Sequence, residues 1–130
     1  MKILVAFDGS KVSRQAAQLA LTHAKAFQAS VVLMNSMVGG PEIPRKEFEA
    51  AERALQQQEI LFTSEKIACE SILSVRGMEA GEAIVQMAEE RKVDEIIIGI
   101  RRKSKVGKLL FGSTAQYIIL RAPCPVITVQ

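Results

Sequence analysis

Aromatic, cysteine and histidine residues are scarce in this sequence, and their scarcity excludes several classes of protein. Of its 130 residues, 5% are aromatic, none is tryptophan and one is histidine. The two cysteines, Cys69 and Cys124, are too few and too far apart for a disulfide scaffold or a metal cluster, so buried thiols are expected. Because 48% of the residues are hydrophobic and few are aromatic, the core must be aliphatic.

Long hydrophobic runs are also missing. No apolar run approaches the roughly 20 residues that span a bilayer, and the chain starts in a strand pattern rather than a signal peptide. We therefore expect a cytoplasmic protein without membrane contact. The net charge of +3 is modest for a nucleic-acid binder, and Tyr117 lies in an expected helix rather than on a stacking platform. RNA and DNA are therefore unfavoured ligands.

Short apolar runs alternate with segments of helical periodicity along the whole chain. The strands are expected at residues 2–7, 30–37, 67–75, 94–99 and 126–129, and the helices at 10–27, 44–66, 79–91 and 113–121. The first two runs are continuously apolar, as in strands covered on both faces, whereas the third alternates and is expected near a sheet edge. The pattern predicts one α/β domain, residues 1–130, with an open doubly wound parallel five-stranded sheet and helices on both faces.

Helical spacing also predicts which side chains face the core. The second helix is expected to pack Phe48, Ala51, Leu55 and Phe62 inward, and the last helix Ala115, Ile118 and Ile119. His23 has no second histidine near it, so it is interpreted as a partly exposed helix residue rather than a metal ligand or general base.

Residues 94–114 carry the main functional signal. An apolar run ends at Gly99, a basic loop with Arg101, Arg102, Lys103, Lys105 and Lys108 follows, and Gly112-Ser113-Thr114 opens a helix. Glycine allows close approach, and the N–H groups and hydroxyls of a helix start bind phosphate oxygens, so a nucleotide is the first ligand to consider. The alternatives are a turn glycine at Gly99, an ordinary helix cap at Ser113 and a solvated basic loop.

This segment resembles the nucleotide signature of the universal stress proteins. That signature reads Gly, two residues, Gly, nine residues, Gly and then Ser or Thr, between the fourth strand and the last helix. Gly99, Gly112 and Ser113 match it, and Arg102 stands at the second glycine. The resemblance extends from residues 3–10 to residues 122–129, and it implies the strand order 3-2-1-4-5.

The resemblance implies a nucleotide in the crevice between the first and fourth strands, where the strand order reverses. Asp8 would accept a hydrogen bond from a ribose hydroxyl or an adenine amino group, although capping of the first helix is an alternative. Ile98 and Ser36 match positions beside adenine and ribose, and Ser113 and Thr114 match positions beside the phosphates. The implied ligand is ATP or ADP, with or without Mg²⁺. The candidate binding residues are Ala6, Phe7, Asp8, Ser36, Ile98, Gly99, Arg101, Arg102, Gly112, Ser113 and Thr114.

Arg102 separates two hypotheses of function. A side chain in place of glycine obstructs close approach of the backbone to phosphate, whereas its guanidinium is itself a fork for phosphate oxygens. The first hypothesis is a nucleotide-binding module that acts in a stress response or in regulation. The second is a nucleotide-independent dimeric interaction protein with a vestigial crevice and an unknown protein partner.

The sequence contains no constellation for efficient catalysis. Gly107-Lys108 is not a Walker A motif, because Arg102 replaces its first glycine and Leu109 its Ser or Thr. His23 is remote from the expected strand ends, which excludes a nucleophilic triad. Beyond Asp8 no carboxylate cluster could hold Mg²⁺, so at most slow ATP hydrolysis is expected.

The last strand predicts self-association. Residues 126–129 are expected at a sheet edge, and they include no Lys or Glu that would block pairing with another chain. Antiparallel contact of this strand with its copy would satisfy the backbone and bury Val126 and Val129. The resemblance implies the same contact, so we expect a homodimer through residues 126–129.

Overall fold

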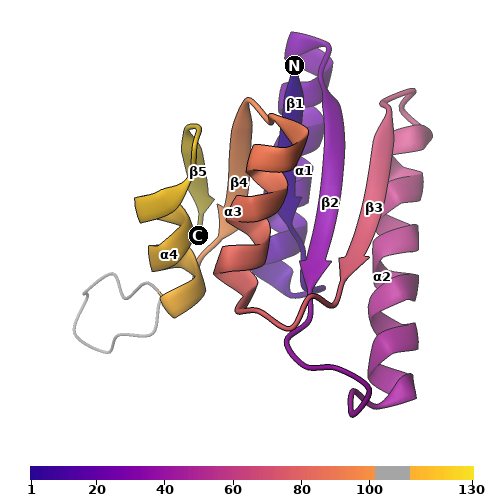
Figure 1. The fold of residues 1–130 in the computed structure, drawn as a ribbon. Helices are drawn as coiled ribbons and strands as arrows, with labels where there is room; N and C mark the ends of the chain where they lie inside the picture. The colour runs from indigo at the N-terminus through magenta and orange to yellow at the C-terminus, as the bar shows by residue number, and fades with distance from the viewer. Residues whose placement is uncertain (102–111) are drawn as a thin grey trace.

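Parallel strands form the centre of the computed structural model, which describes residues 1–101 and 112–130. Along the chain the elements are β1 (Lys2–Ala6), α1 (Lys11–Phe27), β2 (Ser30–Ser36), α2 (Arg45–Thr63), β3 (Cys69–Ser74), α3 (Ala80–Arg91), β4 (Glu95–Gly99), α4 (Ser113–Arg121) and β5 (Val126–Val129). The strands pair in the order β3-β2-β1-β4-β5, and all these pairings are parallel (Figure 1). The predicted fold class and strand order are confirmed.

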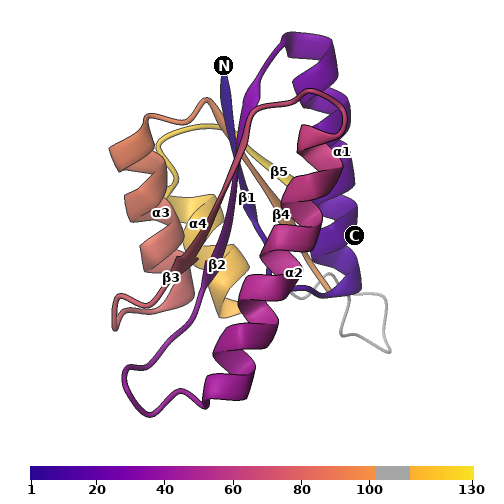
Figure 2. The same ribbon diagram turned by 90° about the vertical axis from the view of Figure 1, so that its right-hand side faces the viewer.

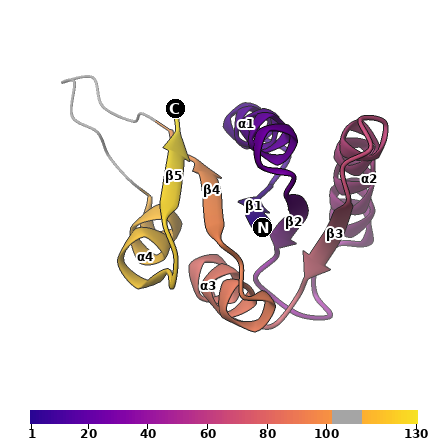
Figure 3. The ribbon, with the colours of Figure 1, turned by 90° about the horizontal axis from the view of Figure 1, so that it is seen from above.

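Helices cover both faces of the sheet. Figures 2 and 3 show α1 and α2 on one face and α3 and α4 on the other. Alternate residues of one strand therefore enter different cores: Ile3 and Val5 pack with the α1 and α2 side, and Leu4 packs with the α3 and α4 side. This explains why β1, β2 and β4 have apolar runs without alternation. Each fully buried Val, Leu or Ile contributes roughly 1.5–3 kcal/mol relative to an exposed one.

Two predicted core contacts are wrong. Phe48 is 36% exposed, because residues 45–50 of α2 extend past the strands, as the lower end of α2 in Figure 1 shows. Ile119 is 41% exposed, because no described element flanks α4 on the side away from α3. The helix α2 also ends at Thr63 rather than near Lys66, which takes a left-handed φ of 63° while the N–H of Ile67 donates to the carbonyl of Phe62.

Both cysteines are free thiols that lie half-buried at the margins of the two cores, so the expectation of buried thiols is met only in part. Burial, with smaller contributions from the charges of Glu59 and Glu70, raises the pKa of Cys69 to about 12. The Cys69 thiol is therefore protonated and a poor nucleophile at neutral pH. In the described ranges, no helix is long and apolar enough to cross a membrane.

His23 connects α1 to the start of β4. Its Nδ1 lies 2.7 Å from Oε1 of Glu95, whose side chain is only 10% exposed, and its own side chain is 24% exposed. The interpretation of His23 as a partly exposed helix residue holds. Its ring also provides a hydrogen-bond partner for the nearly buried carboxylate of Glu95.

The substitution His23→Ala is expected to lower the free energy of unfolding by roughly 1–3 kcal/mol, because it leaves Glu95 Oε1 unsatisfied. Urea denaturation followed by circular dichroism measures the change. Thr22→Ala on the exposed side of the same helix is the control, and it should stay within about 0.5 kcal/mol of the wild type. Equal midpoints for the two variants would show that the His23–Glu95 contact does not stabilise the fold.

Candidate functional site

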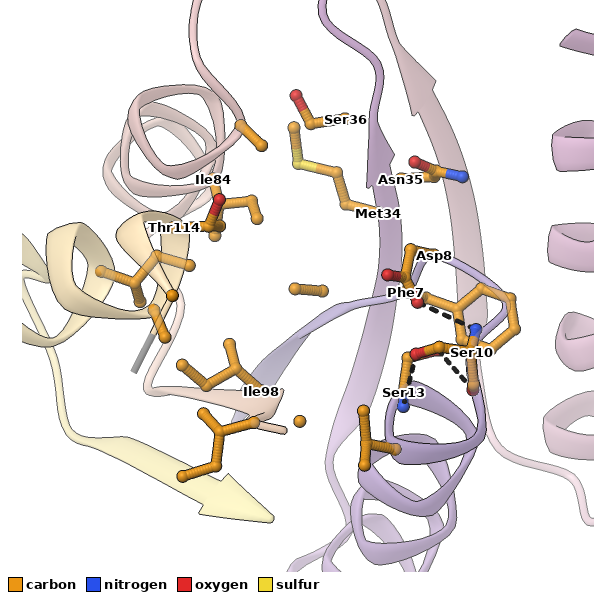
Figure 4. A pocket seen from close by; sticks show the side chains of 18 of the residues that line it. Phe7, Asp8, Ser10, Ser13, Met34, Asn35, Ser36, Ile84, Ile98 and Thr114 are labelled. Atoms are coloured by element: carbon orange, nitrogen blue, oxygen red, sulfur yellow. Dashed lines mark hydrogen bonds between the residues drawn. The ribbon is translucent and has the colours of Figure 1, made fainter. Parts of the chain in front are cut away.

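A cleft of about 330 Å³ lies at the carboxyl ends of β1, β2 and β4, where the strand order reverses (Figure 4). Ligands of open α/β sheets bind at such a reversal, and the volume is at the lower end of the usual range for small-molecule pockets. The register Val5↔Ile97 places the segment after β1 beside the segment after β4. Asp8 and Gly99 thereby line one cleft although they are far apart in sequence.

Most of the residues predicted from the sequence lie on this cleft. Those that line it are Ala6, Phe7, Asp8, Ser36, Ile98, Gly99, Arg101, Gly112 and Thr114. Ser113 is the exposed first residue of α4 and is not one of the lining residues. Arg102 and the rest of residues 102–111 lie outside the described residues, so the prediction for Arg102 stays a prediction.

The cleft also has walls that were not predicted. They consist of apolar side chains from the strand ends and helices, together with polar residues at the start of α1 and the end of β2. The additional lining residues are Ser10, Val12, Ser13, Met34, Asn35, Ala80, Ile84, Ile100, Ala115 and Ile118. The apolar members cannot be told from core residues by sequence. Asn35 could have been found, because it is a polar residue at the end of an apolar strand.

Asp8 is held by the loop that precedes α1. Its Oδ1 accepts the N–H of Ser10 at 2.9 Å, and Ser10 in turn caps α1 by accepting the N–H of Ser13 at 3.3 Å. Ser10, rather than Asp8, is therefore the helix cap. Burial raises the pKa of Asp8, but hydrogen bonds from Ser10 and Ser13 and the charge of Arg101 together hold it below its ordinary value. Asp8 is thus ionised at neutral pH and is a hydrogen-bond acceptor only.

Gly99 allows α1 to approach the end of β4. A Cβ atom at this position would lie 2.7 Å from both the carbonyl carbon and the oxygen of Val12, which is closer than real side chains allow. Glycine is therefore required at this position for the packing of α1 against β4, whether or not it also leaves room for a ligand. The contact places the first turn of α1, with Ser10 and Ser13, on one side of the cleft.

The start of α4 forms the opposite side. Gly112 is its N-cap, with no hydrogen bond from a side chain, so the expectation that Ser113 caps this helix is wrong. The first intrahelical hydrogen bond runs from the N–H of Gln116 to the carbonyl of Gly112. The N–H groups of the three residues before Gln116 therefore have no acceptor within the helix. They provide donors at the helix end that carries a partial positive charge.

Among the described lining residues, Asp8 and Arg101 are the charged ones. Within residues 1–101 and 112–130, no group of three or more His, Cys, Asp or Glu side chains is placed to hold a metal ion. Any Mg²⁺ in this part of the cleft would therefore take most of its oxygen ligands from water and from the bound molecule, as Mg²⁺ often does at phosphate sites.

This arrangement defines an open parallel α/β protein with a small-molecule cleft at its strand-order reversal. The Universal stress protein family matches residues 1–130, and the chain belongs to this family. A universal stress protein of Thermus aquaticus is 35% identical over 135 residues, which cover 98% of this chain and 97% of that protein.

Solved structures agree with this assignment. The universal stress protein from Archaeoglobus fulgidus has a TM-score of 0.85 at 31% identity, covering 99% of this chain and 96% of that chain. A structure of the universal stress protein from the same organism in complex with dAMP has a TM-score of 0.80 at 28% identity, covering 99% and 95% of the two chains. The family predicted from the sequence is confirmed.

The packing role of Gly99 predicts a selective loss of stability. The substitution Gly99→Ala is expected to lower the free energy of unfolding by roughly 1–3 kcal/mol, because the new methyl group overlaps the backbone of Val12. Gly112→Ala is the matched control, since Gly112 has a φ of −65° and no atom of a described residue lies within 4 Å of an added Cβ. Urea denaturation of both variants measures the difference, and a Gly99→Ala protein as stable as the control would contradict the packing role.

Proposed function

We propose that this member of the universal stress protein family binds an adenine nucleotide in the cleft between the ends of β1 and β4. The observation that carries the proposal is the pairing of an ionised acceptor, Asp8, with the open helix start at Gly112 on opposite sides of one cleft. A nucleotide offers complementary groups, hydroxyl and amino donors at one end and an anionic phosphate at the other. The dAMP complex of the relative from A. fulgidus supports this ligand class.

Each part of a nucleotide has a matching part of the cleft. The phosphate meets the N–H groups at the start of α4 that have no acceptor within the helix, the hydroxyl of Thr114 and the charge of Arg101. The carboxylate of Asp8 accepts a hydrogen bond from a hydroxyl of the ribose. The base lies against the apolar wall of the cleft, which includes Met34 and Ile98. ATP and ADP are the proposed ligands, with Mg²⁺ held by phosphates and water.

The proposed role is regulatory. An occupied cleft contacts the start of α4 and Arg101, the two described ends of the basic loop, so binding changes the surface that a protein partner meets. The second function, an interaction protein that does not use a nucleotide, is favoured by one observation, which is Arg102 at the second glycine of the signature. Assay of an adenine compound released on denaturation of protein purified without added nucleotide tests the first function directly.

The substitutions Asp8→Ala and Gly112→Val are each expected to weaken ATP binding about tenfold, roughly 1.4 kcal/mol. The first removes the acceptor for ribose, and the second places a branched side chain over the helix start. Isothermal titration calorimetry with ATP, ADP and AMP measures the effect.

Asp94→Ala is the control for Asp8→Ala, because Asp94 lies at the amino end of β4, at the opposite end of the strands from the cleft, and accepts the N–H of Lys2 at 2.7 Å. It should bind ATP as the wild type does. If the wild type gives no heat with any of the three nucleotides at millimolar concentration, the cleft is vestigial and the interaction-protein function takes its place.

We also propose a homodimer through β5. Among the described strands, this one pairs with β4 alone, so its other side is an edge of the described sheet. Beside that edge, α4 exposes Ile119 at 41% and Leu120 at 78%. The exposed side chains of α4 and the backbone donors and acceptors of β5 thus form one continuous surface. A second copy that paired with β5 would also cover these side chains.

The register of β5 decides which residue tests this dimer. The carbonyls of Pro125 and Val129 accept from the N–H groups of Ile96 and Ile100, so alternate residues of the strand face β4. The backbone of Ile127 therefore also faces β4, and the backbones of Val126 and Thr128 face the free edge. The N–H groups of Val126 and Thr128 are therefore the ones directed toward a partner, and Thr128 is the one of the two in the middle of the strand.

Thr128→Pro is expected to convert the dimer to a monomer, because proline removes an outward donor without removing a bond to β4. Light scattering at micromolar concentration should give a mass near 14.2 kDa for this variant and about twice that mass for the wild type. Thr128→Val keeps the N–H and should remain dimeric. A wild-type mass near 14.2 kDa would refute the proposed dimer.

A further inference from the structure

Two serine hydroxyls without partners lie at the carboxyl ends of β2 and β3. Within the described part of the chain, Ser36 Oγ and Ser74 Oγ are the buried side-chain oxygen or nitrogen atoms that have no hydrogen-bond partner. Buried polar groups nearly always have a partner, and leaving one unsatisfied lowers stability. Two such groups close together therefore require an explanation.

The strand register places the two serines next to each other on one face of the sheet. Ser36 is the register partner of Ser74, and the N–H of Met37 donates to the carbonyl of Ser74 at 2.8 Å, which fixes this end of the pair of strands. Met34 and Ile72, two residues earlier in each strand, both pack on the α3 and α4 side. Alternate residues of a strand share a face, and Figure 4 shows Ser36 on the same side of β2 as Met34. Neighbouring strands are roughly 4.8 Å apart, which allows a hydrogen bond between paired hydroxyls.

The two serines differ in their access to the cleft. Ser36 lines the cleft, whereas Ser74 is 5% exposed and is not one of the lining residues. Rotation about χ1 of the two side chains brings one Oγ to the other. A hydroxyl has one proton to donate and two lone pairs that accept. If Ser74 donates to Ser36, the proton of Ser36 is free to point into the cleft, whereas the reverse bond leaves the proton of Ser74 with no acceptor among the described residues.

We infer that Ser74 is a positioning residue, which orients Ser36 for contact with the ligand. Its hydroxyl donates to Ser36 Oγ and thereby turns the Ser36 proton toward the cleft, where this proton meets an acceptor atom of the bound nucleotide. Hydrogen bonds in such a chain polarise one another, so the strength of Ser36 as a donor depends on Ser74. This inference rests on the proposed function, and it adds a residue of β3 that acts on the cleft only through β2.

The test is a double-mutant cycle. Ser74→Ala is expected to weaken nucleotide binding roughly threefold, because Ser36 keeps its hydroxyl but loses the bond that orients it. Ser36→Ala is expected to weaken binding roughly tenfold. In the Ser36→Ala background the change at Ser74 should have no further effect, since no hydroxyl remains to be oriented. Titration calorimetry with ATP, ADP and AMP measures the dissociation constants of the wild type, both single variants and the double variant, after circular dichroism has confirmed their fold.

Ser71→Ala is the matched control, since it removes a hydroxyl from the same strand on the opposite face. The neighbouring alternate residues Cys69 and Leu73 pack on the α2 side, and Ser71 Oγ donates to Oε2 of Glu59 at 3.0 Å. This variant should leave the dissociation constants unchanged. A loss of affinity equal to that of Ser74→Ala would show an effect of β3 on the fold rather than on Ser36, and it would overturn the inference.

The outcomes separate the inference from the proposed function. If the wild type binds a nucleotide, and Ser74→Ala binds it equally well or loses the same factor in both backgrounds, the inference is wrong and the proposed function stands. If Ser74→Ala does not fold, Ser74→Cys takes its place, because a thiol is only a weak donor and should weaken binding in the same way. If the wild type binds none of the three nucleotides, both the inference and the proposed function are overturned.

Discussion

The close contact between Val12 and Gly99 is the constraint on which the candidate site depends. It joins the first turn of α1 to the end of β4 with no room for a side chain between them. This contact fixes the loop that carries Asp8 relative to Arg101, and with it one side of the cleft. A second, less extreme approach occurs at Gly81 of α3, where a Cβ would lie 3.2 Å from the carbonyl oxygen of Thr114 at the start of α4, on the other side of the cleft. Two glycines in contact with helices thus determine the shape of the cleft.

Much of the fold could be predicted because its causes are local. Continuous apolar runs identify β1 and β2 as strands covered on both faces, and Ser10 identifies the start of α1. Side-chain exposure at Phe48 and Ile119 could not be predicted in the same way. Both residues have the spacing of a buried helix face, but burial also requires a neighbour. Only the assembled sheet determines where α2 extends past the strands and which side of α4 no described element flanks.

The polar residues of the candidate site could be predicted from the sequence, whereas most of its apolar residues could not. Asp8, Gly112 and Thr114 carry recognisable chemistry and spacing, and they line the cleft. Ile84, Ile100 and Ile118 line it too, but their side chains are indistinguishable from core residues in sequence. Gly99 was expected to make room for a ligand, whereas its contact with Val12 requires glycine even in an empty cleft. Asn35 also lines the cleft, so a polar residue at the end of a buried strand can itself indicate where a cleft begins.

The shortness of α4 has a mechanical consequence. Thr114, on the cleft, and Leu120, on the exposed side near β5, are six residues apart on one helix, an axial separation of roughly 9 Å. This helix is held against α3 by the close approach at Gly81. The wall of the cleft and the exposed apolar surface beside β5 therefore belong to one short helix, with no loop or hinge between them.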